Sequence, residues 1–267
     1  MGKVYLRSYE KMKFAVLLAG QLRTWPRAAK HIFSYYNKLG VKPDYYLATW
    51  DKTRDFWWPE EHSIKSERAV DLKSDIQDIF DQYNQTVVNV SVEPMIPRHD
   101  ISYYYQAHLA KICNTMKQQH ERLHGTYDQV VETRPDVFLV GEPKNISRTK
   151  IMQFTGGYFW KTDEGLPQVS DFYFRSDSTT NDIISRRDRF NLNHERGASV
   201  PESMFGNHYV FARWLMTNGL TRDSSQSDFE HAGIFRPNFP ENPETLSVDQ
   251  IKKLDQEWIH HQWYGSH

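Results

Sequence analysis

The chain contains very little cysteine and no long apolar run, and both shortages restrict where it can work. Its single cysteine, Cys113, excludes an internal disulfide and favours a reducing compartment. Cys113 lies in a helical pattern, so we interpret it as a small core residue and not as a nucleophile. The longest apolar run, from Phe14 to Ala19, is far too short to span a membrane, and the sequence opens without a signal-peptide pattern. We therefore expect a cytoplasmic protein without a membrane span.

An excess of one charge is also missing. The 33 Lys and Arg residues nearly balance the 34 Asp and Glu residues, which gives a formal net charge of -1 and a sequence pI of about 6.9. A chain with this balance has no general attraction for nucleic acid or for an anionic membrane surface. What the sequence does contain is aromatic residues, at 14% of the chain. Their flat rings suit sugars and bases as well as ordinary cores.

Apolar patterns alternate between the strand period and the helix period along the first half of the chain. Residues 13–20 form an apolar run that ends in Gly20, as expected of a buried parallel strand. Pro26 suits the first turn of a helix that runs to about Leu39, and Gly40 ends it. The other elements predicted in this half are a strand at 44–51, a helix at 71–83, a strand at 86–92, a helix at 103–123 and a strand within 127–140.

This alternation is typical of an α/β fold with a mostly parallel central sheet and helices on both faces, of the Rossmann type. After residue 140 the pattern becomes irregular. We expect short strands at 154–160 and 171–175, helices at 181–190 and 202–218, and a final short helix that begins at Ser247. No internal repeat or low-complexity linker divides the chain. We therefore expect one domain over residues 1–267, with halves at about 13–140 and 141–267.

Charged residues alternate where the last strand of the first half ends. Glu132, Arg134 and Asp136 occupy every second position, so on an extended chain their side chains point to one side. Carboxylates bind hard divalent cations and a guanidinium suits phosphate, and ligands of open α/β sheets bind beyond the carboxyl ends of the strands. The pattern predicts a nucleotide diphosphate held with a metal. A solvated strand end with a structural Arg–Glu pair is the alternative.

Two other strand ends supply candidate contacts with such a ligand. The loop after the first strand has neither the Lys-Ser/Thr pair of a phosphate-binding P-loop nor the repeated glycines of a dinucleotide fingerprint. Gly20 still allows a close backbone approach, and Arg23 could meet a pyrophosphate. After the second strand, Trp50 could stack on a base and Asp51 could accept a hydrogen bond from a base or ribose. An ordinary strand-to-helix turn and a packed tryptophan beside a surface aspartate are the alternatives. The candidate donor-binding residues are Ala19, Gly20, Gln21, Arg23, Trp25, Thr49, Trp50, Asp51 and Arg134.

Three strand ends in this order, Gly-Gln-Leu-Arg-Thr-Trp, Thr-Trp-Asp and Arg-Pro-Asp, resemble those of a group of small glycosyltransferases of viruses and bacteria with a GT-A-like fold. The similarity covers roughly residues 13–215. It implies a nucleotide-sugar donor, with UDP favoured over GDP, and Mn²⁺ or Mg²⁺ bound by an Asp-x-Asp element. Glu132-x-Arg134-x-Asp136 stands at the matching place and departs from Asp-x-Asp. Arg134 could take over part of the cation's role.

The resemblance also implies roles for residues in the second half. Glu202, at the predicted start of a helix, is the first candidate for a catalytic base on the acceptor hydroxyl, and Asp171 is the second. An acidic residue in a first helical turn also has a purely structural explanation in the helix dipole. His208 and His231 are weaker candidates for a further metal ligand. The basic run 186–189 is interpreted as a solvated helix face or an acceptor contact.

The predicted function is therefore transfer of a sugar from a nucleotide-diphosphate sugar to a glycan or other hydroxyl acceptor. On this reading residues 13–140 bind the donor and residues 141–267 bind the acceptor, in the cytoplasm of the producing cell or of an infected host. A non-enzymatic carbohydrate-binding protein and another nucleotide-dependent transferase are the alternatives. The donor sugar, the acceptor, the stereochemistry and the oligomeric state do not follow from these residues.

Overall fold

We describe the fold from a computed structural model of the chain. The structure describes residues 12–22, 24–54, 67–69, 72–95, 102–140, 153–154, 159–161, 167–169, 173–189, 207–220, 231–234, 239–240, 242, 246–247, 249–254 and 256–257. Within these residues no helix is both long enough and apolar enough to cross a membrane.

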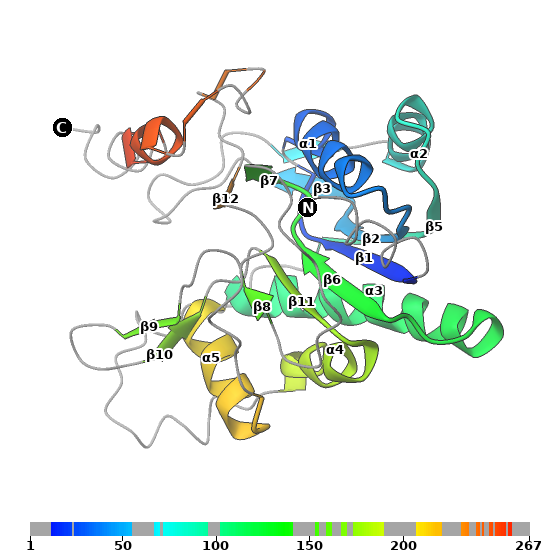
Figure 1. The fold of residues 1–267 in the computed structure, drawn as a ribbon, viewed down its shortest axis with the longest axis vertical. Helices are drawn as coiled ribbons and strands as arrows, with labels where there is room; N and C mark the ends of the chain where they lie inside the picture. Colours follow the sequence, from blue (N-terminus) through cyan, green and yellow to red (C-terminus); the bar gives the residue numbers. More distant parts are fainter. Residues whose placement is uncertain are drawn as a thin grey trace, which may run out of the picture.

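A six-stranded sheet forms the centre of the molecule (Figure 1). Its strand order is β5 (Val87–Glu93), β2 (Asp44–Trp50), β1 (Phe14–Ala19), β6 (Gln129–Thr133), β11 (Tyr173–Ser176) and β8 (Gln153–Phe154). The first four strands are parallel to one another, whereas β11 is antiparallel to both β6 and β8. The mostly parallel sheet predicted from the sequence is confirmed. β8 and β11 come from beyond residue 140, so both halves of the chain build this one sheet.

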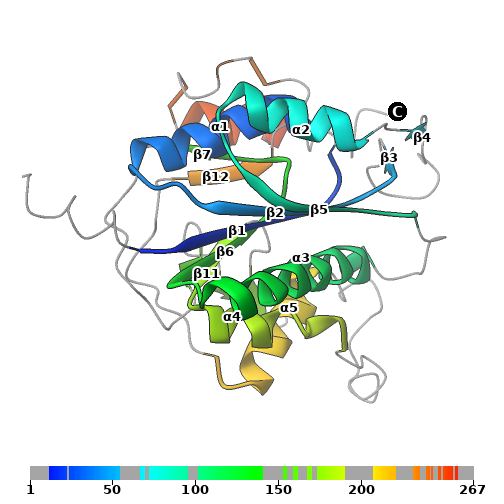
Figure 2. The same ribbon diagram turned by 90° about the vertical axis from the view of Figure 1, so that its right-hand side faces the viewer.

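Helices cover both faces of the sheet (Figure 2). α1 (Trp25–Lys38) and α2 (Leu72–Gln82) lie on one face. α3 (Ser102–His124), α4 (Ser178–Ile184) and α5 (Asn207–Thr217) lie on the other. The handedness of crossover connections explains this division. The connections through α1 and α2 lead toward β5, at the edge of the sheet. The connection through α3 leads in the opposite direction, past β1 to β6. Because crossovers between parallel strands are right-handed, connections that lead in opposite directions place their helices on opposite faces.

Two apolar clusters fill the space between these layers. All six residues of β1 are buried, as expected of a central strand between two helical layers. Val16 and Leu18 pack with the α1 and α2 residues Ile32 and Phe80. The intervening residues of β1 join a second cluster with α3, in which Cys113 is fully buried. The predicted core position of Cys113 is confirmed.

The strand predicted within 127–140 is two strands with a turn between them, which corrects the prediction of one extended segment. β6 ends at Thr133, and β7 (Val137–Val140) pairs with β12 (His231–Ile234) in a separate antiparallel ribbon. Pro135 has no backbone N–H and a fixed φ, so it interrupts the ladder, and the amide of Val137 then donates to the carbonyl of Arg134 at 3.3 Å.

Short elements complete the chain after β2 and β7. β3 (Lys52–Arg54) pairs with β4 (Glu67–Ala69), and β9 (Phe159–Lys161) pairs with β10 (Pro167–Val169). The single strand predicted at 154–160 is instead divided between β8 and β9. A 3-10 turn, η4 (Arg187–Arg189), follows α4.

The predicted final helix is present, with residues 249–254 helical. Ser247 and Gln250 bond reciprocally in the manner of a capping box: the Gln250 amide donates to Ser247 Oγ at 3.2 Å, and the Ser247 amide donates to Gln250 Oε1 at 2.8 Å. Ile251 of this helix packs with Phe239 and with Phe138 of β7. The C-terminal part therefore packs where β7 leaves the sheet.

Candidate functional site

The strand order of the sheet reverses between β1 and β6. From β1 the chain proceeds outward through β2 to β5, and it then returns to add β6 on the other side of β1. The carboxyl ends of β1 and β6 therefore lie side by side where this order reverses. The chain enters α1 after β1 and β7 after β6, and these two elements pack together on one face of the sheet (Figure 2). In open α/β sheets this topological switch point is where ligands bind.

Gly20 brings the two loops at this switch point into contact. It follows β1 with a φ of +152°, a conformation that side chains disfavour, and its amide donates to the carbonyl of Ala48 at 3.1 Å. A Cβ at Gly20 would lie 3.0 Å from Cδ of Pro135 and 3.9 Å from Cβ of Arg134. Gly20 therefore packs closely against the turn after β6, and its close approach to a pyrophosphate stays a prediction.

Arg134 and Asp136 form a bidentate ion pair in this turn. Arg134 Nε donates to Asp136 Oδ1 at 2.9 Å, and Nη2 donates to Oδ2 at 2.8 Å. The two side chains differ in exposure: that of Arg134 is 16% exposed and that of Asp136 is 2% exposed. Arg134 is therefore the more exposed member of the pair, and Asp136 is its buried partner.

Glu132 does not share this arrangement. Its side chain is 1% exposed and forms an ion pair with Arg187 of η4, whose Nη1 donates to Glu132 Oε2 at 3.3 Å. The Arg187 guanidinium lies over the rings of Phe174 and Phe211, at 5.8 and 4.9 Å from the ring centroids. These residues belong to the side of the sheet covered by α4 and α5. The expectation that Glu132, Arg134 and Asp136 share one face is corrected, because the strand alternation stops at Thr133.

The described residues do not fit a divalent cation between Glu132 and Asp136. Each of these carboxylates pairs with a different arginine and is buried. Across the described ranges, no group of three or more His, Cys, Asp or Glu residues is arranged to hold a metal ion. Glu132 does form a structural ion pair, but its partner is Arg187 and not Arg134 of the motif, and the pair is buried where the alternative interpretation expected a solvated strand end.

Both tryptophans predicted to contact the donor are buried in the core. Trp25 begins α1 and packs on Phe33 and Phe80, with ring centroids 5.8 Å away in each case. Trp50 is buried under α3 and stacks on His108 at 5.7 Å with an interplanar angle of 8°. Each of these residues is 2% exposed, so a base could stack on either ring only after the surrounding side chains move.

The remaining candidates at the ends of β1 and β2 are placed as follows. Ala19 and Thr49 are fully buried in the sheet, which leaves no side-chain surface for a donor, while Gln21 is partly exposed beside Gly20. Asp51 is partly exposed, and its Oδ1 accepts a hydrogen bond from the amide of Met95 at 2.8 Å. Asp51 thus links the ends of β2 and β5, one strand away from the switch point.

Several predicted residues lie outside what the structure describes. Arg23, Asp171 and Glu202 are not among the described residues. For the two candidate histidines only the backbone is described: His208 lies in α5, and His231 lies in β12 opposite Val140.

Sequence reasoning missed two residues that shape this region, Arg187 and Pro135. The sequence pattern predicts that the run 186–189 is solvated or contacts an acceptor, yet Arg187 is buried and Asp188 pairs with Lys111 at 2.6 Å. No local pattern indicates that Arg187 pairs with Glu132, which is 55 positions earlier. The contact of Pro135 with Gly20 is equally non-local.

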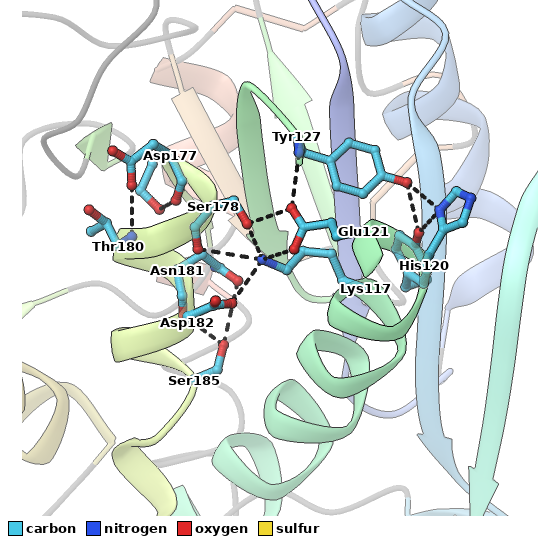
Figure 3. Close-up of polar contacts among 12 residues, drawn as sticks. Lys117, His120, Glu121, Tyr127, Asp177, Ser178, Thr180, Asn181, Asp182 and Ser185 are labelled. Atoms are coloured by element: carbon cyan, nitrogen blue, oxygen red, sulfur yellow. Dashed lines mark hydrogen bonds and ion pairs between the residues drawn. The ribbon is translucent and has the colours of Figure 1, made fainter. Parts of the chain in front are cut away.

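A second polar cluster lies at the opposite end of the sheet (Figure 3). Lys117 of α3 is completely buried, and its Nζ donates to Ser178 Oγ at 2.5 Å and to Asp182 Oδ1 at 2.9 Å. It also lies 3.3 Å from Glu121 Oε2. Ser178 follows β11, which runs from its pairing with Thr133 back to Val130. The cluster therefore joins α3 to α4 near the amino end of β6 and leaves no open surface for a substrate at Lys117.

A phenol network adjoins this cluster. Tyr127 Oη donates to Asp44 Oδ2 at 2.6 Å and lies 2.7 Å from both Tyr46 Oη and His120 Nδ1. Burial is the main reason why the pKa of Tyr127 and the pKa of Tyr46 are raised well above the ordinary tyrosine value. Burial likewise raises the pKa of the Cys113 thiol, and the nearby Glu132 adds to that effect. These groups stay neutral at physiological pH and serve packing and hydrogen bonding.

Comparison with known proteins adds no further constraint on the site. No protein-family model matches the chain, and no curated protein matches it.

Proposed function

We propose that this protein is a glycosyltransferase that uses a nucleotide-diphosphate sugar, with a GT-A-like variant of the Rossmann architecture. The observation that carries the proposal is the juxtaposition of Gly20 and Arg134 at the switch point between β1 and β6. This is where open α/β sheets bind nucleotides, and Arg134 has a partly exposed side chain there. The resemblance of the three strand ends to small GT-A-like enzymes supplies the reaction class.

In the proposed reaction the bond between the anomeric carbon of the sugar and the diphosphate oxygen breaks. Negative charge then grows on the leaving diphosphate, and a fixed guanidinium stabilises that charge most as the bond lengthens. Arg134 is assigned this role, with Arg23 as a second cation. A hydroxyl of the acceptor forms the new bond to the anomeric carbon, and its proton passes to Glu202 or, second, Asp171 if the configuration inverts.

UDP is the favoured nucleotide of the donor, with GDP next, and a glycan is the favoured acceptor. The resemblance also implies Mn²⁺ or Mg²⁺ at the diphosphate. The described carboxylates Glu132 and Asp136 do not form the predicted ligand pair, so no step of this mechanism uses a metal. We further propose that the reaction takes place in the cytoplasm of the producing or infected cell, because the chain has one buried cysteine.

A thermal-shift panel of UDP, GDP, CMP and ATP tests the donor site. A ligand that binds only the folded state raises its stability by mass action, so UDP or GDP should raise the melting temperature in a concentration-dependent manner. An absence of any shift with all four nucleotides would contradict the donor site. Sugar affinity without nucleotide affinity would support the carbohydrate-binding alternative.

A transfer assay then tests the reaction class. The protein is incubated with the UDP-sugars or GDP-sugars that the panel selects, and nucleotide release is measured with and without glycan acceptors. Glu202→Gln should abolish transfer while the nucleotide still binds, since the proposed base is lost and the donor site is kept. Full transfer activity in that variant would remove Glu202 from the role, and nucleotide binding without any sugar transfer would favour another nucleotide-dependent transferase.

A further inference from the structure

The charges at the switch point are arranged differently from those of a metal-ligand pair. A site for Mn²⁺ or Mg²⁺ needs carboxylate oxygens that the ion can reach. Here the side chains of Asp136 and Glu132 are 2% and 1% exposed, respectively. The side chain of Arg134 is 16% exposed. A ligand that approaches the turn after β6 therefore meets the side chain of Arg134 before it meets either carboxylate.

Both carboxylates are also neutralised by arginine. Asp136 accepts two hydrogen bonds from Arg134, and Glu132 accepts from both terminal nitrogens of Arg187. A divalent cation bound to either carboxylate would have to displace a guanidinium and would then lie beside it as a like charge. Since arginine stays protonated at any physiological pH, this competition does not disappear on titration.

Arg134 is held in a fixed position for anion binding. Its paired hydrogen bonds to Asp136 set the plane of the guanidinium, and the turn that carries it is packed through Pro135 against Gly20. A planar guanidinium held in this way loses little conformational freedom when it binds. Its Nε and Nη2 donate to Asp136, so the N–H groups on its other edge, which includes Nη1, are the ones that suit phosphate oxygens. The chemical class recognised is a phosphate or diphosphate group.

We infer that Arg134, oriented by Asp136, binds the diphosphate of the nucleotide donor in the place of a divalent cation. This inference rests on the proposed function, since it specifies how the same site recognises its donor. Asp136 acts as a positioning residue, because it touches the guanidinium and not the ligand.

Isothermal titration with UDP and with GDP, in EDTA and in Mn²⁺, tests the inference on the full chain. The dissociation constant of the wild-type protein should be the same in EDTA and in Mn²⁺. Arg134→Ala should weaken nucleotide binding at least about tenfold, because a charge-assisted hydrogen bond is lost. The dissociation constant of Arg134→Lys should lie between those of the wild type and of Arg134→Ala, since lysine keeps the charge but lacks the paired N–H donors of a guanidinium. Arg122→Ala, which removes an exposed arginine near the end of α3, should bind like the wild type.

Two variants separate an effect on binding from an effect on folding. Arg134→Ala leaves Asp136 buried without this partner, so the double variant Arg134→Ala/Asp136→Ala removes both groups and should show the same loss of affinity. Asp136→Asn keeps the volume of the side chain and removes its charge. It should weaken binding less than Arg134→Ala, because the guanidinium remains and only its orientation is relaxed.

The outcomes distinguish the inference from the function on which it rests. Nucleotide binding that requires Mn²⁺ would overturn the inference and leave the proposed glycosyltransferase standing. Binding that is insensitive to EDTA and unchanged in Arg134→Ala and in the double variant would also overturn it. An absence of nucleotide binding under every condition would refute the proposed function and the inference together.

Discussion

At the scale of single residues, Gly20 controls how closely the ends of β1 and β6 approach each other. Its positive φ and its contact with Pro135 are two separate requirements for glycine. Gly40, which ends α1, has a φ of +68°, but a Cβ placed there would meet nothing within 4 Å. Gly20 thus combines a positive φ with a steric contact, whereas Gly40 has a positive φ alone.

Gly20→Ala should therefore destabilise the protein more than Gly40→Ala. Gly40→Ala places alanine in the left-handed region, at a cost of about 1–2 kcal/mol, and the φ of +152° at Gly20 is less accessible still to alanine. Gly20→Ala adds the displacement of Pro135, which costs about 1–3 kcal/mol more. Urea unfolding of the two variants measures the difference. Equal losses of unfolding free energy would show that the contact with Pro135 has no energetic weight, and Gly20→Ala should also weaken nucleotide binding, since it moves the turn that carries Arg134.

At the scale of elements, α3 connects the sheet to the layer of α4. It contributes apolar residues such as Cys113 to the core beneath β1 and β2, and its Lys117 enters the buried cluster with Ser178 and Asp182. Lys111, six residues earlier on the same helix, makes an ion pair with Asp188 but keeps 42% of its side chain exposed. Both lysines thus belong to α3 and pair with an aspartate, but only Lys117 is buried.

Lys117→Met should destabilise the protein more than Lys111→Met. Removal of the buried ammonium leaves Glu121 and Asp182 without their cation, which costs about 3–5 kcal/mol for a buried pair. At Lys111 the ammonium is partly solvated but its partner Asp188 is 8% exposed, so loss of this pair should cost less, about 1–3 kcal/mol. Chemical denaturation measures both. Similar losses of unfolding free energy in the two variants would show that the Lys117 cluster does not stabilise the contact between α3 and α4. Neither substitution should alter the nucleotide dissociation constant of the folded protein.

At the scale of the whole molecule, stability should depend on pH through the buried tyrosines. Tyr46 and Tyr127 have a raised pKa in the folded state and the ordinary value of 10.0 when unfolded. Below pH 10 both states carry the proton, so the free energy of unfolding does not change through these groups. Above pH 10 the unfolded chain loses protons that the folded protein retains, so stability falls as the pH rises.

Tyr127→Phe should reduce this alkaline loss of stability. The variant should lose about 1–2 kcal/mol at neutral pH, because Asp44 and Tyr46 lose a hydrogen-bond partner, and its unfolding free energy should then decline less steeply above pH 10. Urea titrations between pH 7 and about pH 11 provide the measurement. Tyr83→Phe serves as the control, because it has the same number of tyrosines as Tyr127→Phe. A slope identical to that of the wild type in Tyr127→Phe would remove Tyr127 from the explanation.

Local patterns in the sequence were sufficient for most elements of the parallel sheet and its helices. The expected strand at 13–20 is β1 (Phe14–Ala19), and the helix expected from Pro26 to about Leu39 is α1 (Trp25–Lys38). The reason is that a continuous apolar run, a proline in a first turn and a terminal glycine act over neighbouring residues. Where one residue interrupts the ladder, as Pro135 does after β6, the apolar pattern continues and conceals the break.

The sequence by itself thus determined the α/β class, the alternation of elements and the presence of polar groups after each strand. Tertiary structure alone decided the strand order, the placement of Trp25 and Trp50 in the core and the partner of Glu132. These depend on which faces meet after the chain has folded, and Glu132 meets Arg187 across 55 positions of sequence. Charge patterns along one strand carry no information about a partner on another element. The predicted carboxylate pair is therefore two separate arginine–carboxylate pairs, one within the turn after β6 and one between β6 and η4.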